Sequence, residues 1–378
     1  MLIKKYNYLL GCIIAAFLVS CSTTKGPEPK PIPKFANDKM VTVKWIDNDI
    51  ATSPAYQFVP VLEENTLFTA DGSGNLFRID PTDGTVINYH RLSRGLSSGT
   101  AVSSDSIFVT TDDGYLLSVS KATGNLKWQA QLPTISIEAP QVGGDVVVVK
   151  TNNAELLAYD VHTGKLLWVY QKHNPLLTLR ANNTFQVVGR EVVLFGQPNG
   201  RLALINLANG NTIWENYVAI PEGATDLDKL TDIAMRPVIN DKLICVATFN
   251  GKITCLDAVS SNILWSKKFS SNSGIIIDEH HVYSISTDGI VYAFDKNSGS
   301  IVWKNDILQY RTLSVPVFLD NHILTIDNEG YISLLNTNDG KLVASLASNL
   351  RDGVSYPWSD GKKVFAQSAN GYIAEIVK

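Results

Sequence analysis

Short alternating runs of apolar and polar residues recur along the chain from about residue 41 to its end. In residues 283–295 (YSISTDGIVYAFD), two such runs flank the pair Asp288-Gly289. An Asp-Gly pair between strand-like runs is a strong signal for a tight β-hairpin. A second turn ending at Gly299 then leads into residues 300–303, which indicate a further, outer strand. No stretch shows a sustained helical period, so the pattern predicts an all-β fold.

The hairpin belongs to a repeat that occurs eight times. Its turn residues, spaced by 38 to 51 positions, are Gly74, Gly114, Ala154, Gly200, Gly251, Gly289, Gly330 and Gly371. A second turn glycine follows ten positions later in most copies, and tryptophan follows fourteen positions later in five of them. Units of about 40–50 residues with four strands each are typical of β-propeller blades. We therefore predict an eight-bladed β-propeller over residues 41–378, with four antiparallel strands in each blade.

The last repeat is incomplete. The chain ends at Lys378, seven residues after Gly371, so this unit lacks an outer strand and its tryptophan. A strand-like run with a tryptophan, VTVKW, occurs at residues 41–45. We expect this N-terminal strand to pair with the last hairpin and Trp45 to take the vacant tryptophan position. Such pairing would close the ring and cover an edge that otherwise invites aggregation.

Two residue types recur at fixed places in the repeat and allow two interpretations. The tryptophans could form a ligand-stacking platform, but their constant position favours packing between adjacent blades, where a buried aromatic side chain contributes 150–250 Å² of area. An aspartate or asparagine stands six places after most turn residues, for example Asp160. Such a side chain is expected to orient the following turn through hydrogen bonds to the backbone and to take no part in catalysis.

The N-terminus has the features of a secretory leader. Lys4 and Lys5 precede an apolar run at residues 8–19, which is twelve residues long. A membrane-spanning helix needs about 20 residues, so residues 1–20 are predicted to be a signal peptide. The run ends in LVSC at residues 18–21, which resembles the bacterial lipobox and implies lipidation of Cys21, with palmitate among the acyl chains. Residues 21–40, rich in proline, are expected to form a flexible tether.

Composition and the remaining candidate residues restrict the chemistry further. The net charge is −4, which gives no basis for nucleic-acid binding. Cys245 and Cys255 lie on neighbouring strands of one predicted hairpin, where they are either paired or reduced. The six histidines show no metal-ligand spacing, and the sequence contains no Gly-x-Ser-x-Gly or C-x-x-C-H motif. We expect no cofactor and no enzymatic activity.

Residues 156–168 (LLAYDVHTGKLLW) resemble the repeat of the pyrroloquinoline-quinone propeller superfamily. That superfamily contains quinone-dependent dehydrogenases and non-enzymatic scaffolds. A lipobox followed by a single propeller resembles the BamB family over about residues 41–378. The resemblance implies a scaffold of the outer-membrane β-barrel assembly (BAM) complex that assists the folding and insertion of outer-membrane proteins. Ser22 in place of aspartate implies sorting to the outer membrane, where the lipid anchor would hold the chain on the periplasmic face.

Two insertions lengthen the repeat, one before Gly200 and one before Gly251, and both are expected on the same face of the disc. In the BamB family the corresponding loops contact a POTRA domain of BamA. The resemblance assigns this partner contact to Leu177, Leu179, Arg180 and Asp232. Leucines beside an arginine also match the composition of a binding hot spot. Alternatively, the leucines pack under their own loop and Arg180 pairs with a nearby carboxylate.

Two other functions remain as alternatives. A PQQ-dependent dehydrogenase would need a quinone at the propeller axis, a cation held by oxygen ligands and a carboxylate base. The adjacent cysteine pair common in that family is missing here. A peptide- or glycan-binding propeller would use the central funnel, and its function would depend on funnel residues and not on Arg180. Exposed blade edges could in addition hold unfolded outer-membrane proteins by β-augmentation.

Overall fold

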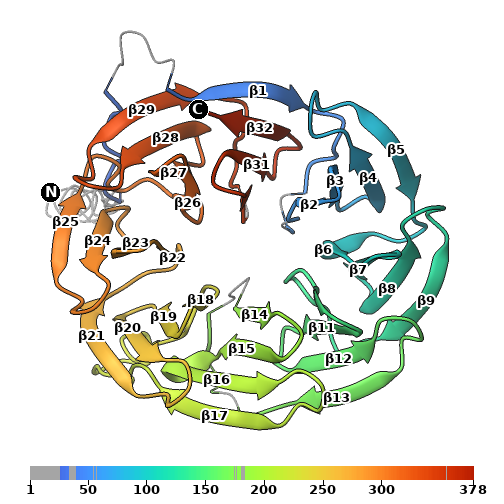
Figure 1. Cartoon of the computed structure of the whole chain (residues 1–378), viewed down its shortest axis with the longest axis horizontal. Coiled ribbons are helices and arrows are strands. Elements are labelled where there is room, and N and C mark those ends of the chain that lie inside the picture. The colour runs from blue at the N-terminus through green and yellow to red at the C-terminus, as the bar shows by residue number, and fades with distance from the viewer. Residues whose placement is uncertain are drawn as a thin grey trace, which may run out of the picture.

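The structure is a computed structural model that describes residues 26–33, 40–53, 55–56, 58–173, 175, 177–179, 184–354 and 356–378. The strands form eight four-stranded antiparallel sheets arranged as blades around a central axis (Figure 1). One short 3₁₀ segment, η1 (Pro198–Gly200), is the only helical element in the described part of the chain. The predicted all-β, eight-bladed propeller is confirmed.

Each blade runs outward from a short inner strand. Blades 1 to 4 contain β2 (Val61–Glu63), β3 (Thr66–Ala70), β4 (Asn75–Ile79) and β5 (Val86–Arg91); β6 (Leu96–Val102), β7 (Ser106–Thr111), β8 (Tyr115–Ser120) and β9 (Leu126–Gln131); β10 (Gln141–Gly143), β11 (Val146–Lys150), β12 (Leu156–Asp160) and β13 (Leu166–Tyr170); and β14 (Phe185–Val188), β15 (Val192–Gly196), β16 (Arg201–Asn206) and β17 (Thr212–Tyr217). Blades 5 to 8 contain β18 (Val238–Asn240), β19 (Leu243–Ala247), β20 (Gly251–Asp257) and β21 (Ile263–Phe269); β22 (Ile275–Ile277), β23 (His281–Ile285), β24 (Val291–Asp295) and β25 (Ile301–Asn305); β26 (Val317–Leu319), β27 (His322–Ile326), β28 (Tyr331–Asn336) and β29 (Leu342–Ala347); and β30 (Trp358–Ser359), β31 (Lys363–Gln367), β32 (Ile373–Val377) and β1 (Thr42–Asp47).

The N-terminal strand closes the ring as predicted. β1 pairs with β32 as the outer strand of blade 8, and Trp45 lies opposite Glu375. Glu375 stands four residues after the turn residue Gly371, and in blade 3 Trp168 lies opposite the equivalent residue, Ala158. In both blades a β-bulge immediately precedes the tryptophan. The first strand of the chain therefore reproduces the local geometry of an ordinary outer strand.

The tryptophans pack between blades, which confirms the packing interpretation. The indole Nε1 of Trp168 donates a hydrogen bond of 2.8 Å to the carbonyl of Leu207 in the next blade. The same bond links Trp45 to Pro81, Trp128 to Val161, Trp214 to Ala258, Trp265 to Lys296 and Trp303 to Thr337. A Cβ at Gly210 would lie 2.8 Å from the Trp168 ring, so glycine leaves room for the indole there. The apolar clusters likewise combine side chains of adjacent blades, which places the core between them.

The repeated carboxylates hold the turns. Asp160 accepts hydrogen bonds from the amides of His162 and Thr163 and from the Thr163 hydroxyl. These bonds, led by that of the hydroxyl, lower the pKa of the Asp160 carboxyl. The expected role of this repeat position is therefore confirmed. In the fifth copy the turn differs slightly from the sequence alignment, because Asn250 and not Gly251 has the positive φ, 48°.

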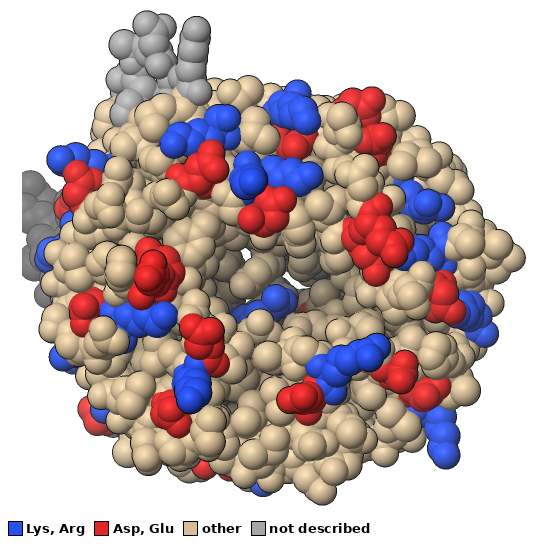
Figure 2. Space-filling view, in the orientation of Figure 1, with Lys and Arg blue, Asp and Glu red and all other residues tan. Residues whose placement is uncertain are grey.

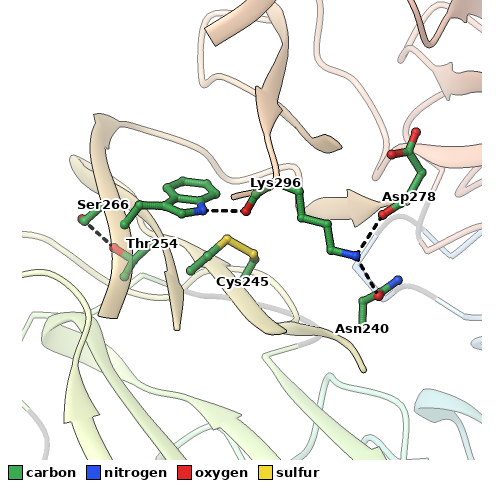
Figure 3. Close-up of a disulfide and its surroundings, with 8 residues drawn as sticks. Asn240, Cys245, Thr254, Ser266, Asp278 and Lys296 are labelled. Carbon is green, nitrogen blue, oxygen red and sulfur yellow. Dashed lines mark hydrogen bonds between the residues drawn. A yellow bond between two sulfur atoms is a disulfide. The ribbon is translucent and has the colours of Figure 1, made fainter. Parts of the chain in front are cut away.

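Cys245 and Cys255 form a disulfide, which decides between the two states that the sequence left open. They lie directly opposite each other on β19 and β20, with Cα atoms 4.2 Å apart. Figure 3 shows the bond at the centre of blade 5, beside the Lys296 side chain. The disulfide lies within blade 5. Beside it, the Lys296 ammonium of blade 6 bonds to Asn240 of blade 5 and to the carbonyl of Asp278 in its own blade, so polar contacts link the two blades.

The N-terminal segment before β1 is described only in part. The predicted signal peptide and Cys21 lie outside the described residues. Residues 26–33 have no regular secondary structure, and they lie against the connection between blades 6 and 7. Within the described ranges, no helix has the length and hydropathy needed to span a bilayer.

Candidate functional site

The two insertions lie on one face of the disc. Residues 171–184 connect β13 to β14, and residues 218–237 connect β17 to β18. Each runs from the outer strand of one blade to the inner strand of the next. Because the strands of every blade alternate in direction, all connections of this kind emerge on the same face, together with the turns between the second and third strands. This agrees with the expectation from the sequence.

Asp232 of the second insertion joins it to the first. Its side chain is 3% exposed, and one carboxylate oxygen accepts a 2.7 Å hydrogen bond from the amide of Leu179. The other oxygen accepts a 3.0 Å hydrogen bond from the amide of Asn199 in the β15–β16 turn. Asp232 therefore fixes the first insertion, the second insertion and the β15–β16 turn relative to one another.

The end of the second insertion is anchored in the core, whereas its middle is exposed. Ile233 is 2% exposed and its amide bonds to the carbonyl of Gln197. The backbone carbonyl of Asp232 accepts a bond from the amide of Phe249 in blade 5. In contrast, Leu227 is 67% exposed. The insertion thus has a rigid base and a middle that presents apolar surface to solvent.

A buried ion pair holds the end of the first insertion. Glu138, in the connection between blades 2 and 3, is 1% exposed and lies 3.2 Å from the Lys150 ammonium. Its carboxylate accepts hydrogen bonds from the Thr184 and Phe185 amides and from the Thr184 hydroxyl. Compensation of this kind is what a buried carboxylate requires. The sequence analysis missed Glu138, and its only signal is a lone charge in the otherwise uncharged stretch 132–141.

The structure brings together three of the four predicted partner-binding residues. Leu177 is 46% exposed and therefore does not pack under its own loop. Leu179 is partly buried and lines a pocket of about 200 Å³ together with Asp232 and Ile233. Arg180 lies outside the described residues. Asn199, which the sequence analysis also missed, follows Pro198 at the predicted turn and completes the polar contacts below Leu179.

A second concave region lies on the propeller axis. It has a volume of about 720 Å³, and its lining includes Pro60, Pro140 and Pro357, each of which stands fourteen positions before the turn residue of its blade. The guanidinium of Arg236 reaches the ring of Tyr356 from three blades away, with a separation of 4.3 Å. Figure 2 shows the central opening of the disc. In the described part of the chain, no group of three or more His, Cys, Asp and Glu side chains is arranged to hold a metal ion.

The face of the disc shown in Figure 2 has no large patch of a single charge. Lysine and arginine side chains alternate with aspartate and glutamate around the opening, which agrees with the small net charge of −4. Several carboxylates are paired at short range, for example Asp105 with Lys127 at 2.6 Å. This face therefore lacks the single-sign field that steers a charged partner over a long range.

The repeat, the indole bonds between blades and the eight-bladed ring define a propeller of the pyrroloquinoline-quinone-like class. The family model described as outer membrane protein assembly factor BamB matches residues 72–305, and the chain belongs to the BamB family. The BamB of Bordetella pertussis is 31% identical over 350 residues, covering 92% of this chain and 90% of that protein. The BamB of Escherichia coli K12 is 29% identical over 388 residues, with 98% of each chain covered.

Solved structures agree on the fold. The crystal structure of BamB from Moraxella catarrhalis matches with a TM-score of 0.82 at 21% identity, covering 89% of this chain and all of that one. The quinohemoprotein alcohol dehydrogenase of Comamonas testosteroni matches with a TM-score of 0.72 at 12% identity, covering 90% of this chain and 76% of that one. At these identities the similarity concerns the propeller alone.

Proposed function

We propose that this chain acts as a non-enzymatic scaffold in outer-membrane protein assembly, docking on a POTRA domain of BamA through its two insertions. As a member of the BamB family it is related to proteins named outer membrane protein assembly factor. The finer proposal includes anchoring through a lipid on Cys21 at the periplasmic face of the outer membrane, and contacts with other BAM components.

One observation supports the docking surface above all others, namely the junction of the two insertions at Asp232. The junction holds the backbone of Leu179 in place from below, while Leu177 stays exposed beside it. A pre-positioned loop loses less conformational entropy on binding than a free one. Apolar side chains next to an arginine on such a loop have the composition of an interface hot spot.

The mechanism that follows is binding with a raised local concentration. A lipid anchor would confine the propeller to the membrane surface, where an integral partner also resides, and so favour association without any further contact. The insertions then dock on the POTRA domain and bias its orientation while unfolded outer-membrane proteins arrive. We propose as a further role that the outer edge strands hold such substrates by β-augmentation.

Co-purification from detergent-solubilised outer membranes tests the docking surface. Arg180→Glu and Leu177→Asp are each expected to weaken capture of the BamA-type barrel protein about thirtyfold, as for a hot-spot loss of about 2 kcal/mol. Leu126→Asp is the matched control, because Leu126 is 50% exposed on the outer strand of blade 2, away from the insertions. Capture unchanged in both insertion variants would exclude this surface as the BamA contact.

The axial pocket favours a second candidate function, the binding of a peptide or glycan. Its lining combines apolar residues with the Arg236–Tyr356 pair, and ligand sites typically have such a mixture. If this function is the main one, Tyr356→Ala abolishes complementation of an outer-membrane assembly defect, whereas Arg180→Glu retains it. The opposite result supports the scaffold proposal, and an absorbance spectrum of the purified chain tests separately for a bound quinone.

A further inference from the structure

Residues 26–33 make specific contacts with the connection between blades 6 and 7. The amide of Lys30 donates a 3.0 Å hydrogen bond to the carbonyl of Gln309, and the Lys30 carbonyl accepts a 2.9 Å bond from Nε of Arg311. The Lys30 ammonium lies 2.6 Å from the Asp306 carboxylate. Ile32 is partly buried and packs against the apolar cluster formed between blades 6 and 7. In Figure 1 this segment lies beside these two blades.

The receiving site contains a buried arginine that the segment completes. The Arg311 side chain is 7% exposed, and its Nη1 contacts Asp327 at 2.6 Å and Glu329 at 3.0 Å. These contacts leave Nε directed at the Lys30 carbonyl. The segment pairs this donor and helps to cover the guanidinium, so its docking adds a charge-assisted hydrogen bond to the Lys30–Asp306 ion pair and the apolar contact of Ile32.

The composition of the segment suits such docking. Pro29, Pro31 and Pro33 restrict the backbone to an extended form before binding, which reduces the entropy lost when the segment docks. Only Lys30 and Ile32 are partly buried, and the other residues of 26–33 are exposed. Alternate residues thus face the blades, as expected for an extended peptide on a surface.

We infer that residues 26–33 form a strap that fixes the lipid attachment point at the boundary of blades 6 and 7. The inference rests on the proposed lipidation of Cys21. A free tether from residue 21 to residue 41 could extend about 70 Å, whereas the five residues from 21 to 26 reach about 17 Å. The strap therefore keeps the disc close to the membrane and determines which edge of the disc faces it. The two insertions lie elsewhere on the ring, on either side of blade 4.

Hydrogen exchange in the full mature chain tests the docking itself. In the parent chain the Lys30 amide is expected to exchange at least about ten times more slowly than in the variants Ile32→Ser and Asp306→Lys, because both changes release the strap. Asp105→Lys is the matched control, since it reverses an ion pair of the same 2.6 Å length on blade 2. A Lys30 amide that exchanges equally fast in the parent chain and in the released variants overturns the strap.

Energy transfer to labelled lipid tests the orientation. A donor is placed on Lys341→Cys in blade 7 or on Asp145→Cys in the opposite blade 3, whose parent side chains are 79% and 80% exposed. In phosphatidylethanolamine–phosphatidylglycerol vesicles, transfer from position 341 is expected to exceed that from 145, and Ile32→Ser should remove the difference. Equal transfer in the parent chain overturns the fixed orientation. A chain that fails to associate with vesicles instead overturns the lipidation of Cys21, and the exchange experiment still decides the strap.

Discussion

At the scale of single residues, Asp232 has a different immediate role from the one that family resemblance suggests. Its carboxylate is buried and bonded to the amides of Leu179 and Asn199, so it shapes the proposed interface from beneath. Its assignment to the partner contact stays a prediction. Any effect of this residue on binding is expected to pass through the position of Leu179.

Asp232→Ala is therefore expected to lower both stability and partner binding. The part-buried amides of Leu179 and Asn199 lose their acceptor, and each such loss costs at most about 1–3 kcal/mol. Asp232→Asn keeps one acceptor oxygen and should lose less. Chemical denaturation together with co-purification measures both effects, with Leu126→Ala as the control, because Leu126 is 50% exposed on blade 2, away from both insertions. An Asp232→Ala chain as stable as the parent would contradict this role.

Tyr159 gives the fold a predictable response to alkaline pH. The side chain is 3% exposed, and burial raises the pKa of its phenol to about 12. In the unfolded chain the phenol ionises near pH 10, so unfolding becomes more favourable between pH 10 and 12 by about 1.4 kcal/mol per pH unit for this one group. Below pH 10 its contribution is fully retained.

With Tyr159→Phe, the free energy of unfolding should accordingly decrease less steeply above pH 10. Other groups that titrate in this range should still contribute to the decrease. Urea denaturation at pH 9, 10, 11 and 12 measures the slope. Tyr217→Phe serves as the control, since Tyr217 is 54% exposed. Identical slopes in the parent and in Tyr159→Phe would show that Tyr159 titrates in the folded state as it does in water.

At the scale of elements, β1 has the largest effect for its size. It covers the edge of β32, and Trp45 bonds to Pro81 in blade 1. Deletion of residues 42–47 is expected to expose the β32 edge and cause association of chains, because unpaired edges template further strand pairing. Light scattering after size exclusion measures this. Trp45→Phe, which keeps the strand but loses the indole bond, should remain monomeric, and a monomeric deletion variant would contradict the closing role.

The sequence predicted most elements because the repeat supplies eight versions of the same evidence. The hairpins, the tryptophan positions and even the closing strand follow from residues at fixed offsets. The disulfide did not follow, since pairing depends on a distance between Cα atoms that spacing alone does not set. Glu138 and Asn199 were missed because their partners lie on other blades or insertions. Residues 26–33 gave only the composition of a solvated linker, since their contacts are with residues almost 280 positions away.

At the scale of the whole molecule, the propeller separates three regions around one ring. The insertions lie beside blade 4, the strap lies at the boundary of blades 6 and 7, and the axial pocket lies between them at the centre. A disc held at one edge can present its loops to a partner while the opposite edges stay free. The relative positions of anchor and loops thus become a property of the fold and not of a flexible linker.

The pairing of β1 with β32 also predicts when the ring closes during folding. β1 is synthesised first among the strands of the propeller and β32 is synthesised last. These two strands are nevertheless partners, since residue 42 pairs with residue 377. The first strand must therefore wait until the whole chain is available, and seven blades can form before the eighth is complete. Contacts between such distant residues are slow to form. Ring closure should accordingly be the final, rate-limiting step, and a chain truncated shortly before β32 should remain an open ring.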